Sequence, residues 1–198
     1  MLCANEDKDL FAATWNGSGF GAVTTIESTI QTTDEECFAM AFESTSGHGL
    51  LVYAEDGQNT PRYRTLISGA WSAEASVPNV GQPQRWVRLA AEPGTDRVVL
   101  ATLDIDSDLN ACIWSGSAWG SVSELETHMR ATDRRCFDVA FRATGSALIA
   151  YVRNSQHFTR FRSLSGSTWS GHSDGQNVGD AVEVVQLTPE GAGNIYLA

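Results

Sequence analysis

Residues Ile113–Ser121 read IWSGSAWGS, and this stretch decides the fold because altered copies of it recur along the chain. Its Ser-Gly-Ser centre is typical of a tight turn, and the residues around it favour strands. Each copy of the turn is followed by an aromatic residue. These aromatic residues lie 48 to 51 positions apart in the 198-residue chain, at Phe20, Trp71, Trp119 and Trp169. A period of this length indicates a repeat architecture.

A longer unit is also repeated. The segment LFAATWNGSGFG at 10–21 matches LNACIWSGSAWG at 109–120, an offset of 99 residues. The same offset places Cys37 on Cys136, and RYRTL at 62–66 matches RFRSL at 160–164 after a one-residue slip. We therefore predict a single domain over residues 1–198, made of two tandem repeats of about 99 residues.

Each interval of about 50 residues is expected to hold four short strands. In the first repeat, Cys37–Ser44 is apolar at alternate positions, and Leu50–Glu55 ends at an Asp-Gly pair, which favours a hairpin turn. Further strands are predicted at Pro61–Ile67 and Ala70–Val77. The second repeat follows the same plan at Cys136–Ala143, Ala147–Arg153, Phe158–Leu164 and Thr168–Gly171. No helical period of useful length occurs, which predicts an all-β protein.

Four hairpin-connected strands repeated about every 50 residues resemble the blades of β-propeller proteins. Stacked blades cover both faces of each sheet, which a lone sheet of this size cannot do. We predict a β-propeller of four-stranded antiparallel blades, two per repeat and four per chain. One blade is expected to be completed by both termini, Val182–Ala198 with Leu10–Thr25. The alternatives are half of an eight-bladed ring, closed by a homodimer, and a β-sandwich or β-prism.

The composition limits the choice of partners. A net charge of −11 repels phosphate backbones, so nucleic acid is not an expected partner. No window holds the ~18 apolar residues that a membrane helix needs, so no membrane span is expected. The cysteines show no metal-binding spacing, and we expect Cys37 and Cys136 to be small buried apolar residues.

Alternating acidic residues suggest a calcium site. Asp104, Asp106 and Asp108 resemble the opening of a DxDxDG calcium loop, in which oxygen ligands converge on the ion. Their counterparts in the first repeat are Asn5, Asp7 and Asp9. Leucine replaces the glycine of that pattern in both copies, and no bidentate glutamate follows at its twelfth position. The alternative is a solvated acidic hairpin turn, and no other cofactor is expected.

Arginine pairs on the third strands suggest a ligand site. Residues at i and i+2 of a strand share one face, and guanidinium groups near an indole suit sugars or carboxylates. Blades that end in G-x-x-W resemble those of propeller lectins, and this resemblance implies sugar binding between blades. The candidate ligand-binding residues are Trp15, Trp114, Arg62, Arg64, Arg160 and Arg162. Alternatively, the tryptophans pack between blades and the arginines form ion pairs.

The leading functional prediction is a non-catalytic binding module that binds carbohydrate through Trp and Arg side chains, at an extracellular or cell-surface location. The expected partner is a carbohydrate or a protein ligand. The second is a structural or protein-interaction propeller without a small-molecule site. The third is a glycan-cleaving enzyme, because 24 acidic residues could supply paired carboxylates across blades. The four histidines are scattered with no nucleophile at a recognisable spacing, so no catalytic residue is assigned.

Overall fold

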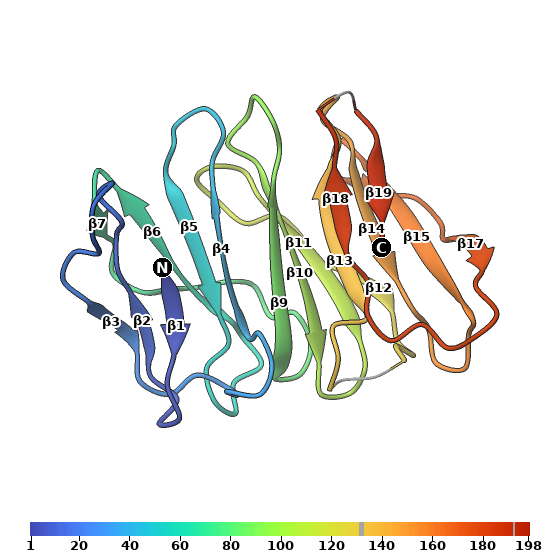
Figure 1. Ribbon diagram of the computed structural model, residues 1–198, viewed down its shortest axis with the longest axis horizontal. Coiled ribbons are helices and arrows are strands. Elements are labelled where there is room, and N and C mark those ends of the chain that lie inside the picture. The colour runs from blue at the N-terminus through green and yellow to red at the C-terminus, as the bar shows by residue number, and fades with distance from the viewer. Residues whose placement is uncertain (131–132, 192) are drawn as a thin grey trace.

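The computed structural model describes residues 1–130, 133–191 and 193–198, and these residues form strands joined by turns (Figure 1). The strands make five antiparallel sheets that lie side by side in a row. The all-β prediction is confirmed. None of the described segments is a helix of the length and apolar character needed to cross a membrane.

The sheets are numbered in chain order. Sheet I holds β1 (Leu2–Ala4), β2 (Leu10–Ala12) and β3 (Thr24–Glu27). Sheet II holds β4 (Phe38–Phe42), β5 (Gly49–Tyr53), β6 (Arg62–Ile67), β7 (Ala70–Trp71) and β8 (Ala75–Ser76). Sheet III holds β9 (Gln84–Ala91), β10 (Val98–Asp104), β11 (Leu109–Trp114) and β12 (Ser123–Glu126). Sheet IV holds β13 (Phe137–Phe141), β14 (Ala147–Tyr151), β15 (Phe158–Ser165), β16 (Thr168–Trp169) and β17 (Ser173–Asn177). Sheet V holds β18 (Leu187–Pro189) and β19 (Ile195–Leu197).

Sheets II, III and IV have the strand order predicted for a blade. In sheet II the outer strand is split, because β7 and β8 both pair with β6. Sheet IV is built in the same way, with β16 and β17 on β15. The register also matches, since Tyr53 faces Arg62 in sheet II and Tyr151 faces Arg160 in sheet IV.

The stretch Ile113–Ser121 forms the predicted hairpin turn. Trp114 and Trp119 face each other across it, and the Ser115 hydroxyl accepts the Ala118 N–H at 3.1 Å. Gly116 has a φ of +95°, and a Cβ there would lie 2.9 Å from Asp96 Cβ. Glycine is therefore required both for the turn and for the close approach of the neighbouring loop.

The predicted completion of one blade by both termini is wrong for the described residues. Sheets I and V are separate and lie at opposite ends of the row (Figure 1). The reason is that β1 takes the place beside β2 that β19 was expected to fill. The eight-bladed ring of two chains and the grouping into two 99-residue repeats stay predictions.

Apolar cores lie between consecutive sheets. Between sheets I and II, Leu51 and Tyr53 pack with Leu10 and Ile26. The second strands β5 and β10 are buried on both faces, which explains their nearly continuous apolar sequences. Cys37 and Cys136 are buried, as predicted.

The inner strands β4, β9, β13 and β18 follow one another along the row. Backbone hydrogen bonds connect two pairs of neighbours at their ends. The Val87 N–H of β9 donates to Glu36 O just before β4 at 2.9 Å, and the Val185 N–H just before β18 donates to Arg135 O just before β13 at 3.1 Å. Asp138 adds a buried clamp, whose carboxylate lies 3.0 Å from Arg88 Nε and accepts the Leu187 N–H at 2.9 Å. One side chain thus connects sheets III, IV and V.

Alkaline pH is expected to destabilise the fold through Cys112. Burial raises the pKa of its thiol from 9.0 to about 11. Between these values the unfolded chain holds fewer protons than the folded chain, so the free energy of unfolding falls as pH rises, by about 2 kcal/mol. Urea unfolding at pH 8 to 11 measures the fall, and the Cys112→Ala variant should show a smaller one. The same decline in both proteins would contradict this assignment.

Candidate ligand-binding site

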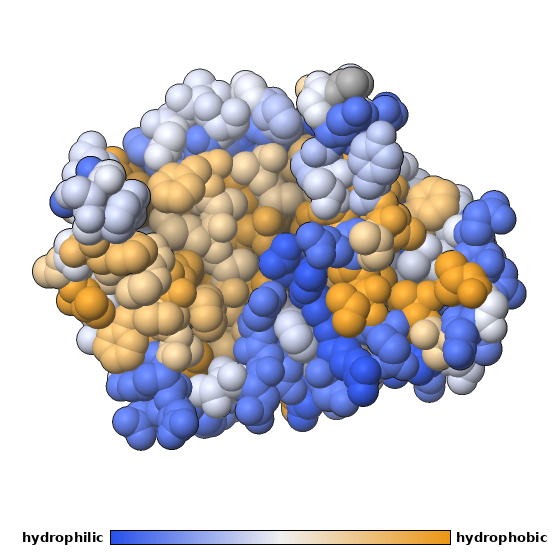
Figure 2. Space-filling model, in the orientation of Figure 1, coloured by the Kyte–Doolittle hydropathy of each residue, from blue (hydrophilic) through white to orange (hydrophobic). Residues whose placement is uncertain are grey.

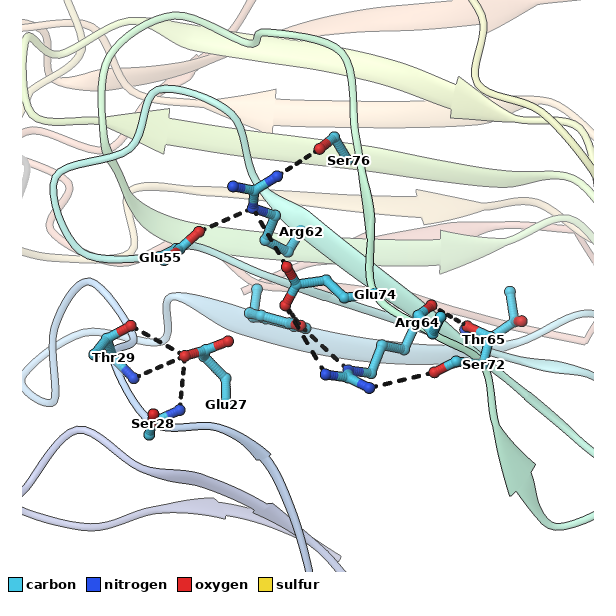
Figure 3. A network of polar contacts seen from close by, with 12 residues as sticks. Glu27, Ser28, Thr29, Glu55, Arg62, Arg64, Thr65, Ser72, Glu74 and Ser76 are labelled. Atoms are coloured by element: carbon cyan, nitrogen blue, oxygen red, sulfur yellow. Dashed lines mark hydrogen bonds and ion pairs between the residues drawn. The ribbon is translucent and has the colours of Figure 1, made fainter.

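The arginine pair of β6 projects from the face of sheet II that is directed toward sheet I (Figure 3). Arg62 Nε lies 2.9 Å from Glu55 Oε2 and 3.7 Å from Glu74 Oε1. Arg64 Nε donates to the Tyr53 hydroxyl at 3.4 Å, and Tyr53 donates to Glu74 Oε2 at 2.6 Å. The structure therefore brings the two arginines together with two carboxylates that compensate their charge.

Tyr53 is fixed in its neutral form by this arrangement. Burial raises the pKa of its hydroxyl, and the hydrogen bond to Glu74 raises it further. The phenol therefore remains a hydrogen-bond donor at neutral pH. Its contacts orient Glu74 and Arg64 relative to each other.

The corresponding arginines of sheet IV make a different set of contacts. Arg162 Nη2 donates to the Leu125 carbonyl at 2.7 Å, and Arg160 Nη1 lies 3.4 Å from Glu126 Oε2. Leu125 and Glu126 belong to β12, so both arginines cross to the neighbouring sheet III. These bonds tie sheets III and IV together at this position.

Among the described residues, neither Arg62 nor Arg64 of sheet II bonds to sheet I. Within the described residues, Arg64 Nη2 forms no hydrogen bond, and its nearest acidic oxygen is Glu74 Oε2 at 4.0 Å. Glu27, which lies 99 positions before Glu126, accepts the backbone N–H groups of Ser28 and Thr29 instead (Figure 3). The first arginine pair is thus bonded within its own sheet and keeps an unused donor.

A groove of about 710 Å³ lies between sheets I and II, and the residues of the arginine network do not line it. Leu66 lines it, two residues beyond Arg64 on the same face of β6. Its walls combine aromatic and hydroxyl side chains, including Trp15, Trp71, Phe42, Thr14, Thr24 and Ser68. Figure 2 shows apolar surface gathered at this end of the molecule. The groove thus offers an apolar surface with hydroxyl groups, and Leu66 is its lining residue nearest to Arg64 along β6.

Trp15 and Trp114 occupy matching places in the two repeats but differ in exposure. Trp15 lines the groove and is 54% exposed. The rings of Trp15 and Phe20 pack edge to face, with 5.2 Å between their centroids. Trp114 is 3% exposed, and its indole N–H donates to Glu43 Oε1 at 2.6 Å. Trp114 thus packs sheet III against sheet II, and the ligand role predicted for it stays a prediction.

The acidic loop of the second repeat, from Asp104 to Asp108, is a hairpin turn that a buried carboxylate stabilises. Asp104 is 0% exposed, and its Oδ1 accepts the N–H groups of Asp106 and Asp108 at 3.0 Å each. Its Oδ2 accepts the Gln82 N–H at 3.0 Å. The carboxylate predicted to bind calcium is thus occupied by backbone donors.

The matching loop of the first repeat is closed by an amide. Asn5 Oδ1 accepts the Asp9 N–H at 2.8 Å, and Asn5 Nδ2 donates to Asp9 Oδ2 at 3.0 Å. The structure gives Asp7 no role in these bonds. In the parts of the chain that are described, no three acidic, histidine or cysteine side chains are placed to hold a metal ion.

EGTA treatment is expected to leave the melting temperature unchanged, because backbone N–H groups already satisfy Asp104. A thermal unfolding scan with and without EGTA measures this. A lower melting temperature that added CaCl₂ restores would support the calcium prediction instead.

The site includes residues that the sequence interpretation missed. Glu74 and Tyr53 complete the arginine network, and Trp71 lines the groove. A signal for Glu74 existed, since it follows the turn aromatic Trp71 by three residues and could have been paired with the arginines. At the corresponding position the second repeat has His172, so repetition did not point to it.

Comparison with solved structures finds similar folds, one of them in a protein described as a fungal lectin. A mutant of AofleA from Arthrobotrys oligospora matches with a TM-score of 0.63 and 11% identity, over 99% of this chain and 59% of that one. A fungal lectin described as a six-bladed β-propeller with a novel fucose recognition mode, Aleuria aurantia lectin, matches with a TM-score of 0.63 and 13% identity over 64% of its chain. A mutant of the same lectin in complex with alpha-methyl-L-fucoside gives a TM-score of 0.62 at 14% identity.

The chain thus spans only 59 to 64% of the length of AofleA and Aleuria aurantia lectin. No family model matches the sequence, and no curated protein matches it significantly. At such low identity the likeness defines the fold. The chain is an all-β protein whose antiparallel sheets are arranged as the blades of a β-propeller.

Proposed function

We propose that the chain is a non-catalytic module that binds a carbohydrate in the groove between sheets I and II. The observation that carries the proposal is the unused donor of Arg64. Arg162 Nη2 is bonded to Leu125 O, whereas Arg64 Nη2 has no hydrogen bond in the described part of the chain. A sugar hydroxyl or ring oxygen is a suitable acceptor for this group.

The chemistry around Arg64 favours an uncharged sugar. Arg62 and Arg64 already lie beside Glu55 and Glu74, so the network has no excess positive charge for an acidic ligand. A sugar hydroxyl can accept from the guanidinium and donate to a carboxylate at the same time. Its C–H face can pack on an exposed indole such as Trp15. The structural neighbours that bind fucose support this class of ligand.

Arg160 and Arg162 are assigned a structural role in this proposal, because both cross to β12. An extracellular or cell-surface location agrees with glycan binding and stays a proposal. A glycan-cleaving activity has no assigned residues, and turnover of chromogenic glycosides by the pure protein would overturn the non-catalytic assignment.

A glycan array followed by titration calorimetry tests the proposal, with methyl α-L-fucoside as the first probe. Arg64→Ala is expected to weaken binding at least about tenfold, because it removes the free donor and disturbs Glu74. Arg162→Ala is the matched control, since it changes the same position of the other repeat. It should leave the affinity unchanged.

Two outcomes would contradict the proposal. One is an array without any signal at high protein valency. The other is an equal loss of affinity in the two variants, which would mean that Arg64 has no special contact with the sugar.

A further inference from the structure

A hollow of about 380 Å³ lies along the inner strands of sheets III, IV and V, and we call it the inner hollow. Its lining residues fall in the same part of three successive inner strands and their hairpins, namely in 88–93, 138–143 and 187–191. These strands, β9, β13 and β18, follow one another in the row (Figure 1), and each is paired with the second strand of its own sheet. Because β9 rises about 10 Å from Arg88 to Ala91, the inner hollow has room for a short extended molecule.

Charged and apolar side chains meet in the inner hollow. Arg88 and Asp138 line it together with apolar residues, which are Ala90, Val139, Ala140, Phe141, Leu187 and Pro189 among others. Glu190 also lines it, in the hairpin after β18, and its carboxylate accepts a hydrogen bond from Asn194 Nδ2 at 2.8 Å. A ligand that fits this wall has a mainly apolar body and a small number of polar atoms.

Arg88 keeps a hydrogen-bond donor for such a ligand. Its Nε donates to Asp138 Oδ1 at 3.0 Å, and its Nη1 lies 3.6 Å from Glu36 Oε2. Its Nη2 forms no hydrogen bond within the described ranges 1–130, 133–191 and 193–198. Asp138 is 2% exposed and already accepts three hydrogen bonds, two of them from backbone N–H groups. Arg88 is therefore the group that can bind the polar end of a ligand.

The charges around Arg88 favour a ligand with one negative group. Asp138 lies 3.0 Å from Arg88 Nε and 3.3 Å from Arg135 Nη1, so it compensates one of two positive charges. The second charge is left to Glu36, which lies 3.6 Å and 4.0 Å from the two guanidinium groups. The Glu36 side chain is 60% exposed and forms no hydrogen bond in the described part of the chain. A ligand carboxylate that accepts charge-assisted hydrogen bonds binds a guanidinium more strongly than such a separated, exposed pair.

We propose that the inner hollow binds a small carboxylic acid with an unbranched apolar chain. The carboxylate pairs with Arg88, and the chain lies against the alanine, valine and leucine side chains of the wall. Among the described residues that line the inner hollow, none has a hydroxyl or amide side chain, so sugar hydroxyl groups would find few partners there. The site is therefore distinct from the proposed carbohydrate groove. The net charge of −11 opposes binding only weakly, because charges beyond about 8 Å are screened at physiological salt.

Titration calorimetry with sodium octanoate tests the proposal, and octanol and octylammonium chloride are the comparison ligands. Octanoate should bind with a Kd of about 1 mM or lower. Octanol lacks the charge that pairs with Arg88 and should bind at least about tenfold more weakly. Octylammonium should bind no better than octanol, because the same guanidinium group repels its charge.

Glu36→Gln tests the site without changing the buried Asp138 clamp. It removes the carboxylate that competes for Arg88, so octanoate should bind about threefold more tightly, in line with the free energy of a partly exposed ion pair. Asp7→Asn is the matched control, because it changes the net charge by the same amount in the hairpin between β1 and β2. It should leave the affinity unchanged. Equal tightening in both variants would contradict the site, since the overall charge would then explain it.

Ala90→Leu fills part of the inner hollow without changing a charged group. It should weaken octanoate binding at least about tenfold. Melting curves verify folding, and if this variant melts below the parent chain, the comparison of Glu36→Gln with Asp7→Asn decides. Absence of octanoate binding would overturn the proposal. Equal binding of octanol, tighter binding of octylammonium, or octanoate binding that a folded Ala90→Leu variant leaves intact would overturn it as well.

Discussion

Replacement of Asp138 by alanine is expected to lower the free energy of unfolding by about 3–5 kcal/mol. Asp138 is 2% exposed, and its carboxylate lies 3.0 Å from Arg88 Nε and 3.3 Å from Arg135 Nη1. It also accepts the N–H groups of Val139 and Leu187. Its removal leaves two partly buried guanidinium groups and two buried N–H groups without this acceptor.

Asp56→Ala is the matched control for that experiment. Asp56 is also paired with a cation, Lys8 at 2.8 Å, but its side chain is 52% exposed. Surface pairs of this kind contribute less than about 1 kcal/mol. Urea unfolding followed by tryptophan fluorescence gives both values. Similar small losses in the two variants would show that Asp138 does not hold the sheets together.

The second large effect is expected at Trp114. Trp114→Ala should destabilise the protein by about 3–5 kcal/mol, because a large buried side chain is lost between two sheets. Trp114→Phe keeps most of the volume but leaves buried Glu43 without the indole donor, which costs about 1–3 kcal/mol. The smaller loss of unfolding free energy in Trp114→Phe gives the contribution of the hydrogen bond, and the further loss in Trp114→Ala gives the contribution of packing.

Trp15→Ala is the control, because Trp15 has the corresponding sequence position and is 54% exposed. Its effect on the free energy of unfolding should stay below about 1 kcal/mol. Equal losses for the two tryptophans would contradict the distinction between a packing residue and a groove residue.

Most of the fold could be predicted because the signals are local. The Gly/Ser turns, the Asp-Gly turn and the alternation in Cys37–Ser44 each specify a hairpin within a few residues. The strand β1 was not predicted, since Leu2–Ala4 is short and lies beside polar residues. That omission led to the wrong arrangement of the termini, as the place of β19 beside β2 was already filled.

The candidate site could be predicted only in part, because it depends on how neighbouring sheets contact each other. The sequence pairs Arg62 and Arg64 on one face, and the structure places them so. The sequence has arginines and tryptophans at the same positions of both repeats. It does not show which of the two arginine pairs bonds to the neighbouring sheet. The difference between Arg64 and Arg162 depends on whether β3 or β12 offers an acceptor within reach.

Asp138 shows a signal that could have been used. An aspartate inside the apolar run CFDVAF indicates a buried carboxylate with fixed partners. The first repeat has Ala39 at this position, so the comparison of repeats gave no hint of a clamp.

A crystal structure with the best sugar from the glycan array tests the central claim most directly. The account predicts sugar density between sheets I and II, with a ring or hydroxyl oxygen in hydrogen-bond contact with Arg64 Nη2. Density beside Arg162 between sheets III and IV, with the Arg64 groove unoccupied, would contradict it.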